Sequence, residues 1–324
     1  MENNTNTVST SDASVPSYHE IFAEIGRQFQ ARKALLFKRV LLITWPVLLF
    51  LIGGYFMKNS SFYSTLTDPQ RLEFAWVVGV YVVLAMLYTA IVSFVFTIEK
   101  QIWLDSFFDK KNLTSKQSWK IAGRLFWPAL WFRIRLWFRY FAIPSLVVLV
   151  TIFITIKSAF LTTTTSSHYD VVLVSSVVAL VVFCIALIIY GYYIRTKLRY
   201  GWFVFLDTWG VTDPFGTAIE EMNKLNEVSR SETFKKSLVA AIGTDTVRGV
   251  VNVAIGAMMR VISGLGGAGG KMLGGLVNVY TRELNRQVTD LANISAQYVL
   301  YRFAHKQVYG TEQEVNENIY KLGE

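Results

Sequence analysis

The stretch FAWVVGVYVVLAMLYTAIVSFVFTI, Phe74–Ile98, has no charged side chain along its whole length. A helix needs about 20 predominantly apolar residues to cross a bilayer, and a charged group near the bilayer centre costs at least about 2.5 kcal/mol. This stretch therefore predicts a transmembrane helix. Three further charge-free runs are Val40–Met57, Tyr140–Ile156 and Val171–Ile194. The predicted fold class is all-α, a polytopic transmembrane helical bundle with one span in each of the four runs.

A very apolar soluble helical core is the alternative to membrane spans. Each helix of such a core would keep one polar face toward water. Val171–Ile194 is apolar on all sides, which favours the membrane. Cys184, the only cysteine, lies within this run, so the chain can form neither an internal disulfide nor a thiolate metal cluster.

Lysine and arginine alternate between the two sides of the predicted membrane. Only Lys58, Arg71 and Lys157 lie in the connections that follow the first and third runs. Since cytoplasmic loops retain basic residues, loops 58–73 and 157–170 are predicted to lie outside and both termini to lie in the cytoplasm. The expected location is the plasma (inner) membrane of a bacterial-type cell. The same rule explains the net charge of +9 without a nucleic-acid partner.

The two ends of the chain are polar. Residues 1–16 lack the apolar segment of a signal peptide and are predicted to be a disordered tail. Ser17 and Glu20 fit a capping box, the pattern in which two side chains bond backbone N–H groups at a helix start. An interfacial helix is therefore expected to run into the first span. Residues 311–324 are expected to be an acidic, solvent-exposed tail.

Basic and aromatic side chains are concentrated in residues 99–139, between the second and third runs. Tryptophan favours the headgroup level of a bilayer, and arginine can reach the phosphates while its stem stays among acyl chains. The segment is predicted to bind anionic lipid headgroups, or a membrane or cytosolic protein partner, or a second copy of the chain. A nucleic-acid platform is the alternative, disfavoured because the neighbouring spans already explain this composition. The predicted interface consists of Arg124, Trp127, Trp131, Arg133, Arg135, Trp137 and Arg139.

An internal repeat is predicted from matching positions in the two halves of the membrane region. Pro46 in the first span corresponds to Pro144 in the third, 98 residues later. After the second and fourth spans, the elbow FFD ending at Asp109 corresponds to FLD ending at Asp207. Because both units start inside, they are expected to be parallel hairpins related by an axis along the membrane normal. The predicted units are residues 17–122 and 123–225, each an interfacial helix, a hairpin of two spans and a cytoplasmic elbow.

Residues 226–310 are predicted to form a C-terminal helical region on the cytoplasmic side. Segment 237–262 is apolar along one face but contains Asp245, Arg248 and Arg260. A span centred there would bury charge, so an amphipathic helix on the membrane or against a partner is expected.

The glycine-rich segment 264–275 contains the letters of a dinucleotide-binding fingerprint, Gly264-x-Gly266-x-x-Gly269. That fingerprint requires a preceding strand, whereas a helical pattern precedes it here. A P-loop is disfavoured too, because Met272 occupies the position of the magnesium-binding Ser or Thr. A flexible hinge or close helix packing is expected instead, and no cofactor. The hinge residues are Gly264, Gly266, Gly267, Gly269 and Gly270.

No catalytic or metal-binding site is predicted, and the protein is expected not to be an enzyme. His19, His168 and His305 fall in different regions of the chain. Asp109 and Asp207 are expected to cap helices or to pair with nearby cations. The predicted spans contain hydroxyl groups but no ionisable side chain of the kind that marks ion pathways, which disfavours a transporter.

Short motifs at the elbows and near the C-terminus resemble those of a known family. They are Leu113-Thr114-Ser115, Ser118-Trp119, Gly123-Arg124, Phe126-Trp127 and Leu300-Tyr301-Arg302. The family comprises uncharacterised bacterial multi-pass membrane proteins and the membrane domain fused to some glycerophosphodiester phosphodiesterases. The resemblance implies a helical bundle of hairpin repeats, often with six spans, and no settled activity. The chain departs from this pattern at Asp245, Arg248, Arg282 and Asp290, and no phosphodiesterase domain is attached.

The expected function is that of a structural or accessory scaffold. It would dock partners or anionic lipid at the cytoplasmic face, where each basic residue near an anionic leaflet contributes about 1 kcal/mol. The alternative is an oligomeric channel or transporter component in which the glycine-rich segment is a re-entrant element. A membrane enzyme ranks third.

Overall fold

The structure, a computed structural model, describes residues 14–60, 65–108, 113–162, 169–210, 214–310 and 317–323. Every helix or strand assigned within these ranges is an α-helix, as the sequence predicts. The predicted capping box is confirmed: Ser17 Oγ accepts from the Glu20 N–H, and the Glu20 carboxylate accepts from the Ser17 N–H. Asp109, His168 and nearly all of the predicted tail 1–16 lie outside the described residues.

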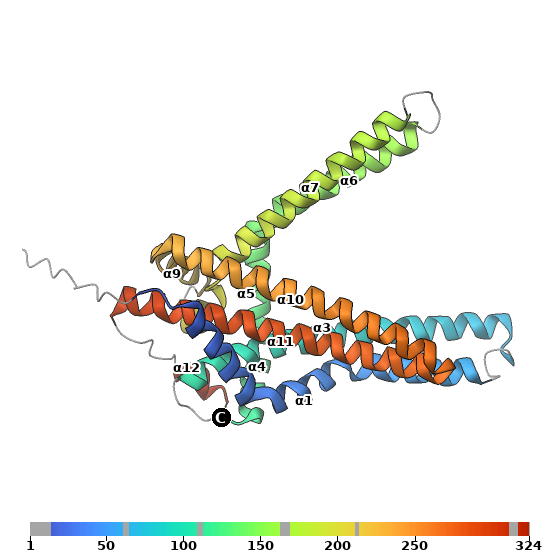
Figure 1. The fold of residues 1–324 in the computed structure, drawn as a ribbon, viewed down its shortest axis with the longest axis horizontal. Coiled ribbons are helices and arrows are strands. Elements are labelled where there is room, and N and C mark those ends of the chain that lie inside the picture. Colours follow the sequence, from blue (N-terminus) through green and yellow to red (C-terminus); the bar gives the residue numbers. More distant parts are fainter. Residues whose placement is uncertain are drawn as a thin grey trace, which may run out of the picture.

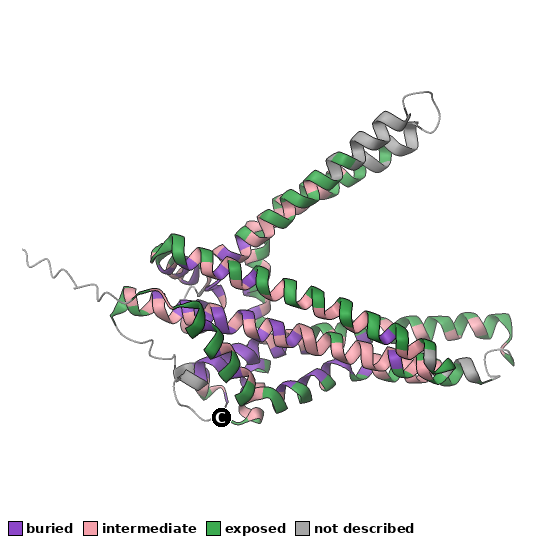
Figure 2. Ribbon diagram, viewed as in Figure 1, coloured by how far each residue is buried: buried purple, intermediate pink, exposed green. Residues whose placement is uncertain are grey.

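Four long helices form the main bundle (Figure 1). α11 packs against α10 on one side and against α1 on the other, and α3 packs against α1. Much of α1, α3 and α10 is exposed (Figure 2), and the exposed side chains include many large apolar ones, for example Trp76, Leu84 and Leu87 of α3. Such a surface is typical of helices that face lipid. The helices are α1 (Tyr18–Asn59), α3 (Asp68–Phe108), α10 (Arg230–Leu265) and α11 (Gly267–Tyr309).

Four stretches of the described chain are long and apolar enough to cross a membrane: Tyr18–Met57, Asp68–Ser106, Val181–Asp207 and Arg230–Gly264. The first three contain all or part of three predicted runs. The last contains segment 237–262, for which an amphipathic helix on the membrane or against a partner is predicted. α10 is long and apolar enough for a span and packs against α11 and α7, so its place relative to the membrane stays a prediction.

The predicted third span is part of a bent pair of helices. α5 and α6 meet at an angle of 61°, and only together do they qualify as a span. α6 and α7 then form a hairpin that projects away from the main bundle (Figure 1). The described side chains of this hairpin are mostly exposed and apolar (Figure 2), as expected for helices surrounded by lipid. The helices are α5 (Phe126–Tyr140), α6 (Ala142–Thr162) and α7 (Tyr169–Lys197).

Each predicted repeat contains a proline that frees a backbone carbonyl group. Proline has no N–H for the carbonyl four residues earlier. The carbonyl that Pro46 leaves free accepts the Tyr88 hydroxyl from α3 at 3.2 Å, and the one that Pro144 leaves free accepts the Tyr190 hydroxyl from α7 at 2.7 Å. Tyr88 and Tyr190 are 102 residues apart and do not correspond at the predicted offset of 98, so the duplication stays a prediction. The units also differ, since α1 is continuous where α5 and α6 are bent.

The largest hydrophobic core, which we call the inner core, lies at one end of the molecule, around the C-terminal half of α11 (Figure 2). It contains a cluster of buried rings formed by Tyr200, Phe203, Tyr298 and Tyr301. The short helices that surround it place α1, α3 and α5 relative to one another. They are α4 (Ser115–Arg124), α8 (Gly201–Asp207), α9 (Pro214–Glu227) and α12 (Glu317–Lys321).

The glycine-rich segment forms the turn between α10 and α11. Only Gly266 separates the two helices, and Gly267 begins α11 with a φ of +55°. The turn lies at the end of the bundle where the first predicted span ends, since a Cβ at Gly269 would be 3.9 Å from the Tyr55 hydroxyl. The predicted hinge residues thus stand at a tight turn between antiparallel helices; hinge motion stays a prediction.

Candidate functional site

A buried ion pair joins α1 and α3 at the inner-core end of their apolar runs. Arg39 donates through Nε and Nη2 to both carboxylate oxygens of Glu99, at 2.9 and 2.8 Å. Ser118 of α4 donates to the same carboxylate at 2.7 Å. The Arg39 guanidinium lies 4.0 Å from the centre of the Trp119 ring. Bidentate geometry and these added contacts satisfy two charges that burial would otherwise penalise.

Lys100 follows Glu99 and is fully buried. Its Nζ donates to the Gln287 amide oxygen at 2.8 Å and lies 3.8 Å from the Asp290 carboxylate. These contacts tie α3 to α11. Lys100 is not among the residues predicted from the sequence. Its sequence context does mark it, because Glu99-Lys100-Gln101 directly follows the longest apolar run and is followed by apolar residues again.

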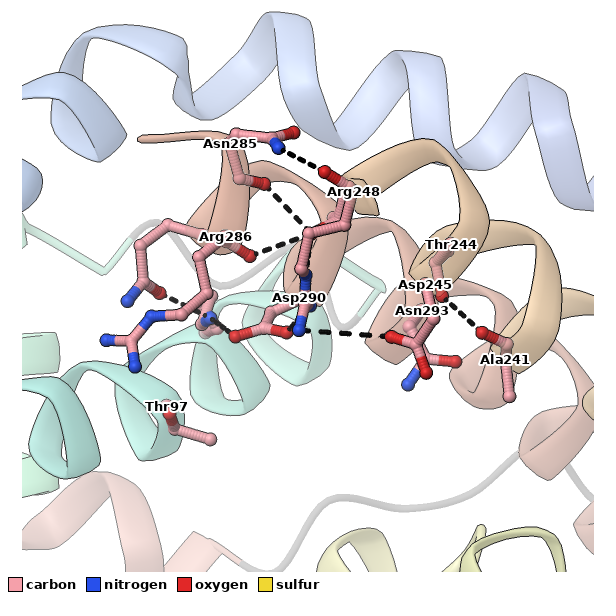
Figure 3. Close-up of polar contacts among 12 residues, drawn as sticks. Thr97, Ala241, Thr244, Asp245, Arg248, Asn285, Arg286, Asp290 and Asn293 are labelled. Atoms are coloured by element: carbon pink, nitrogen blue, oxygen red, sulfur yellow. Dashed lines mark hydrogen bonds and ion pairs between the residues drawn. The ribbon is translucent and has the colours of Figure 1, made fainter. Parts of the chain in front are cut away.

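Three of the charges that argued against spans in the C-terminal region, Asp245, Arg248 and Asp290, are paired (Figure 3), whereas Arg260 and Arg282 form no ion pair among the described residues. Arg248 of α10 bonds the Asp290 carboxylate of α11 and donates to Thr289 at 2.8 Å. Asp245, one turn before Arg248, accepts from Arg195 of α7 at 2.6 Å. The network thus joins α7, α10, α11 and α3, and it concentrates these charges at the end of the bundle nearest the inner core.

A cavity of about 460 Å³ opens beside this network, between α3, α5, α7, α8 and α11. Polar groups from α3 and α11 line one side, including Gln101, Asp290 and Asn293. The amide oxygen of Gln101, whose residue is only 2% exposed, has no hydrogen-bond partner in the described part of the chain. Buried polar groups are normally satisfied, so this oxygen is an unsatisfied acceptor buried in the wall of the cavity.

The opposite side of the cavity is apolar and is flanked by two arginines. Its walls come from α5, the start of α6, α7 and α8. Arg133 of α5 and Arg195 of α7 also line it. Arg195 is held by Asp245, whereas Arg133 lies 5.7 Å from the Phe94 ring and has no ion pair among the described residues. The apolar lining includes Leu136, Trp137, Phe141, Ile194, Leu198 and Trp202.

The structure divides the predicted aromatic and basic interface into two groups. Arg133 and Trp137 line the cavity. Trp127 and Trp131 are exposed on α5, and the Arg135 guanidinium lies 5.3 Å from the Trp131 ring.

The remaining two arginines of that interface have local roles. Arg124 donates to the Leu322 carbonyl at 2.7 Å and so anchors the C-terminal segment. Arg139 lies with its guanidinium 5.9 Å from the Tyr140 ring, next to the bend between α5 and α6. Neither reaches the cavity, and the predicted hinge glycines also lie elsewhere, at the α10–α11 turn.

Two further observations bear on chemistry. Within the described ranges no group of His, Cys, Asp or Glu side chains has an arrangement that could hold a metal ion. Asp207, singled out from its elbow, accepts a hydrogen bond from the Tyr301 hydroxyl and so serves the inner core. Compared with known proteins, the chain matches no family model, no curated protein and no solved structure.

Proposed function

We propose that this protein is a non-enzymatic integral membrane protein that binds a phosphate-bearing lipid of the cytoplasmic leaflet. The headgroup would occupy the cavity between α3, α5, α7 and α11, with the acyl chains beside the α6–α7 hairpin. One observation carries the proposal: Arg133 and Arg195 line a cavity that has polar groups of α3 and α11 on one side and an apolar wall on the other.

The chemistry of the lining matches an amphiphile. Arginine presents planar donors that suit phosphate oxygens, and Arg133 forms no ion pair among the described residues. The one carboxylate that lines the cavity, Asp290, is bound by Arg248. The Gln101 oxygen can accept from a hydroxyl or ammonium group of the headgroup. Trp137, Phe141 and Trp202 offer apolar surface for the glycerol and the first methylenes.

The placement of α5 supports the same reading. Trp127, Trp131 and Phe138 are exposed, and α5 contains arginines but no acidic residue. A helix of this kind is suited to the headgroup level, and an anionic leaflet would attract it by about 1 kcal/mol for each nearby basic residue. A protein partner, the other predicted occupant, would dock on the same exposed side chains of α5.

The topology that accompanies this proposal has both termini in the cytoplasm. α1, α3, the α5–α6 pair, α7, α10 and α11 would each cross the membrane, and the described inner core would lie on the cytoplasmic side. The plasma membrane and the duplication of residues 17–122 as 123–225 belong to the proposal. Six crossings fit the family resemblance; the described chain has four stretches apolar enough to cross, or five with the α5–α6 pair, and the crossing of α11 belongs to the proposal.

Lipid retention tests the function. Native mass spectrometry of the protein purified in mild detergent with phosphatidylglycerol or phosphatidylcholine measures the lipid bound to each chain. We expect preferential retention of phosphatidylglycerol, reduced at least about tenfold in affinity by Arg133→Gln with Arg195→Gln, since each charge-assisted bond contributes about 1.5–3 kcal/mol.

Two variants serve as controls in that experiment. Arg27→Gln removes the same charge from an exposed site on α1, outside the cavity, and should retain lipid as the wild type does. Arg135→Gln removes an exposed α5 charge that does not line the cavity. Equal losses from Arg135→Gln and from the cavity variant would assign binding to the α5 surface and contradict a headgroup site in the cavity.

A further inference from the structure

A second, separate site lies between α10 and α11, toward their glycine turn. Arg260, Lys271 and Arg282 line a groove of about 430 Å³ there, and no carboxylate lines it. None of the three cations forms an ion pair among the described residues. These three residues lie outside the four predicted spans, in α10 and α11; of these two helices, α10 is long and apolar enough to cross a membrane.

These cations lie beside the apolar run of α1. A Cβ at Gly275, which lines the groove, would be 3.9 Å from Leu51 in the middle of that run. An uncompensated cation at bilayer depth costs at least about 2.5 kcal/mol. All three side chains are exposed, and three such cations without a carboxylate favour water and an anion in the groove over lipid tails.

The groove depends on small residues at defined places. A Cβ at Gly256 would be 3.3 Å from Arg282 Nη2, so the missing side chain gives the guanidinium its position across α10. A Cβ at Gly274 would be 2.6 Å from Ser263 Oγ, so a larger residue at 274 would require the Ser263 side chain to move. Close glycine-mediated contact of this type is common between membrane helices.

The cations form a row along the hairpin. Ser263 faces Gly274, and Asn252 bonds Asn285, so the helices are antiparallel and Arg260 falls between Lys271 and Arg282. With a rise of 1.5 Å per residue, successive cations are about 7–9 Å apart along the axis.

Arg282 connects this groove to a second cavity. It also lines a hollow of about 270 Å³ between α1, α3, α10 and α11, together with Arg248. The carboxylate in that hollow, Glu283, accepts from Arg286 at 2.7 Å and is therefore compensated. The row of cations thus continues toward the charged network at the inner end.

We propose that this row is a route for small inorganic anions through the α1–α3–α10–α11 bundle. Lys271, Arg260 and Arg282 would hold the anion in succession, as rings of basic side chains do in anion pores. The route uses different residues from the lipid cavity and does not depend on it.

Chloride flux tests the route. Purified protein is reconstituted into phosphatidylcholine liposomes loaded with potassium chloride, and a chloride electrode records efflux after valinomycin is added. We expect efflux well above that of protein-free liposomes, and a decrease of at least about tenfold for Arg282→Gln, since the barrier rises when a stabilising charge is lost. Arg282→Glu should shift the reversal potential from anion toward cation selectivity, a change that a purely structural role of Arg282 would not produce.

The controls separate this proposal from the lipid site and from misfolding. Lys306→Gln removes an exposed cation of α11 outside the groove and should leave efflux unchanged. The Arg282 variants should retain phosphatidylglycerol and elute as the wild type does on gel filtration. Wild-type liposomes without chloride efflux would overturn the proposal, and so would unchanged selectivity in Arg282→Glu. Movement of fluorescent lipid between leaflets without chloride efflux would assign the groove to lipid headgroups instead.

Discussion

At the scale of single residues, the position of a charge relative to an apolar run says more about helix packing than the presence of the charge does. Glu99 and Lys100 follow the longest run directly, and both are completely buried. Each has partners from other helices: Arg39 and Ser118 for Glu99, Gln287 and Asp290 for Lys100. Because a buried charge is tolerated only with such partners, these residues fix which helices must meet at this end of the bundle.

The Arg39–Glu99 pair gives a test at this scale. Glu99→Leu or Arg39→Leu leaves one buried charge without its partner, so each single variant should lose about 3–5 kcal/mol of stability. The double variant Arg39→Leu with Glu99→Leu removes both charges and should recover much of that loss. Unfolding by sodium dodecyl sulfate, followed by circular dichroism in mixed micelles, measures the difference. A double variant whose loss equals the sum of the single losses would contradict the pairing.

At the scale of helices, the glycine-rich segment joins α10 to α11 in a single-residue break. Gly266 is the break itself, and a Cβ there would be 2.5 Å from the Gly270 Cα and 3.0 Å from its N. These are backbone atoms, so the clash cannot be relieved by a side-chain rotation. Glycine at position 266 is therefore required by the turn, independently of any motion.

Gly266→Ala tests the turn. Overpacking at a site with no freedom to adjust typically costs about 1–3 kcal/mol, so this variant should unfold at a lower detergent concentration or temperature than the wild type. Gly264→Ala is the matched control, because a Cβ at Gly264 has no neighbour within 4 Å. Equal stability of the two alanine variants would show that the α10–α11 turn is not packed as described.

The elements were predictable wherever local sequence determines them. The capping box of Ser17 and the long apolar helices follow from residues close together in the chain. The bend between α5 and α6 was not foreseen, although Pro144 offered a cause, because Pro46 sits in a continuous helix with the same local pattern. Contacts with other helices decide whether a proline bends its helix, and those contacts are distant in sequence.

At the scale of the whole molecule, no single segment predicts that α10 and α11 pack into the bundle. Part of their charge is compensated by partners on other helices, as Arg248 is by Asp290 and Asp245 by Arg195, whereas Arg260, Lys271 and Arg282 form no ion pair among the described residues. Of the proposed lipid site, Arg133 and Trp137 could be predicted, because they belong to the basic and aromatic segment 99–139. Gln101 and Arg195 line the same cavity only because α3, α7 and α11 come together there, and no local sequence pattern encodes that arrangement.

The position of the α10–α11 turn relative to the membrane decides between the original four-span topology and the six crossings proposed above. We expect Gly264→Cys, in a Cys184→Ser background, to react with a membrane-impermeant maleimide added to intact cells, because the turn lies beside the outer end of the first predicted span. Ser60→Cys should react in the same way, since it follows that span, whereas Lys306→Cys should react only after permeabilisation. Labelling of Gly264→Cys only after permeabilisation would return α10 and α11 to the cytoplasmic side. The anion route would then be excluded, while the lipid cavity at the inner end would stand.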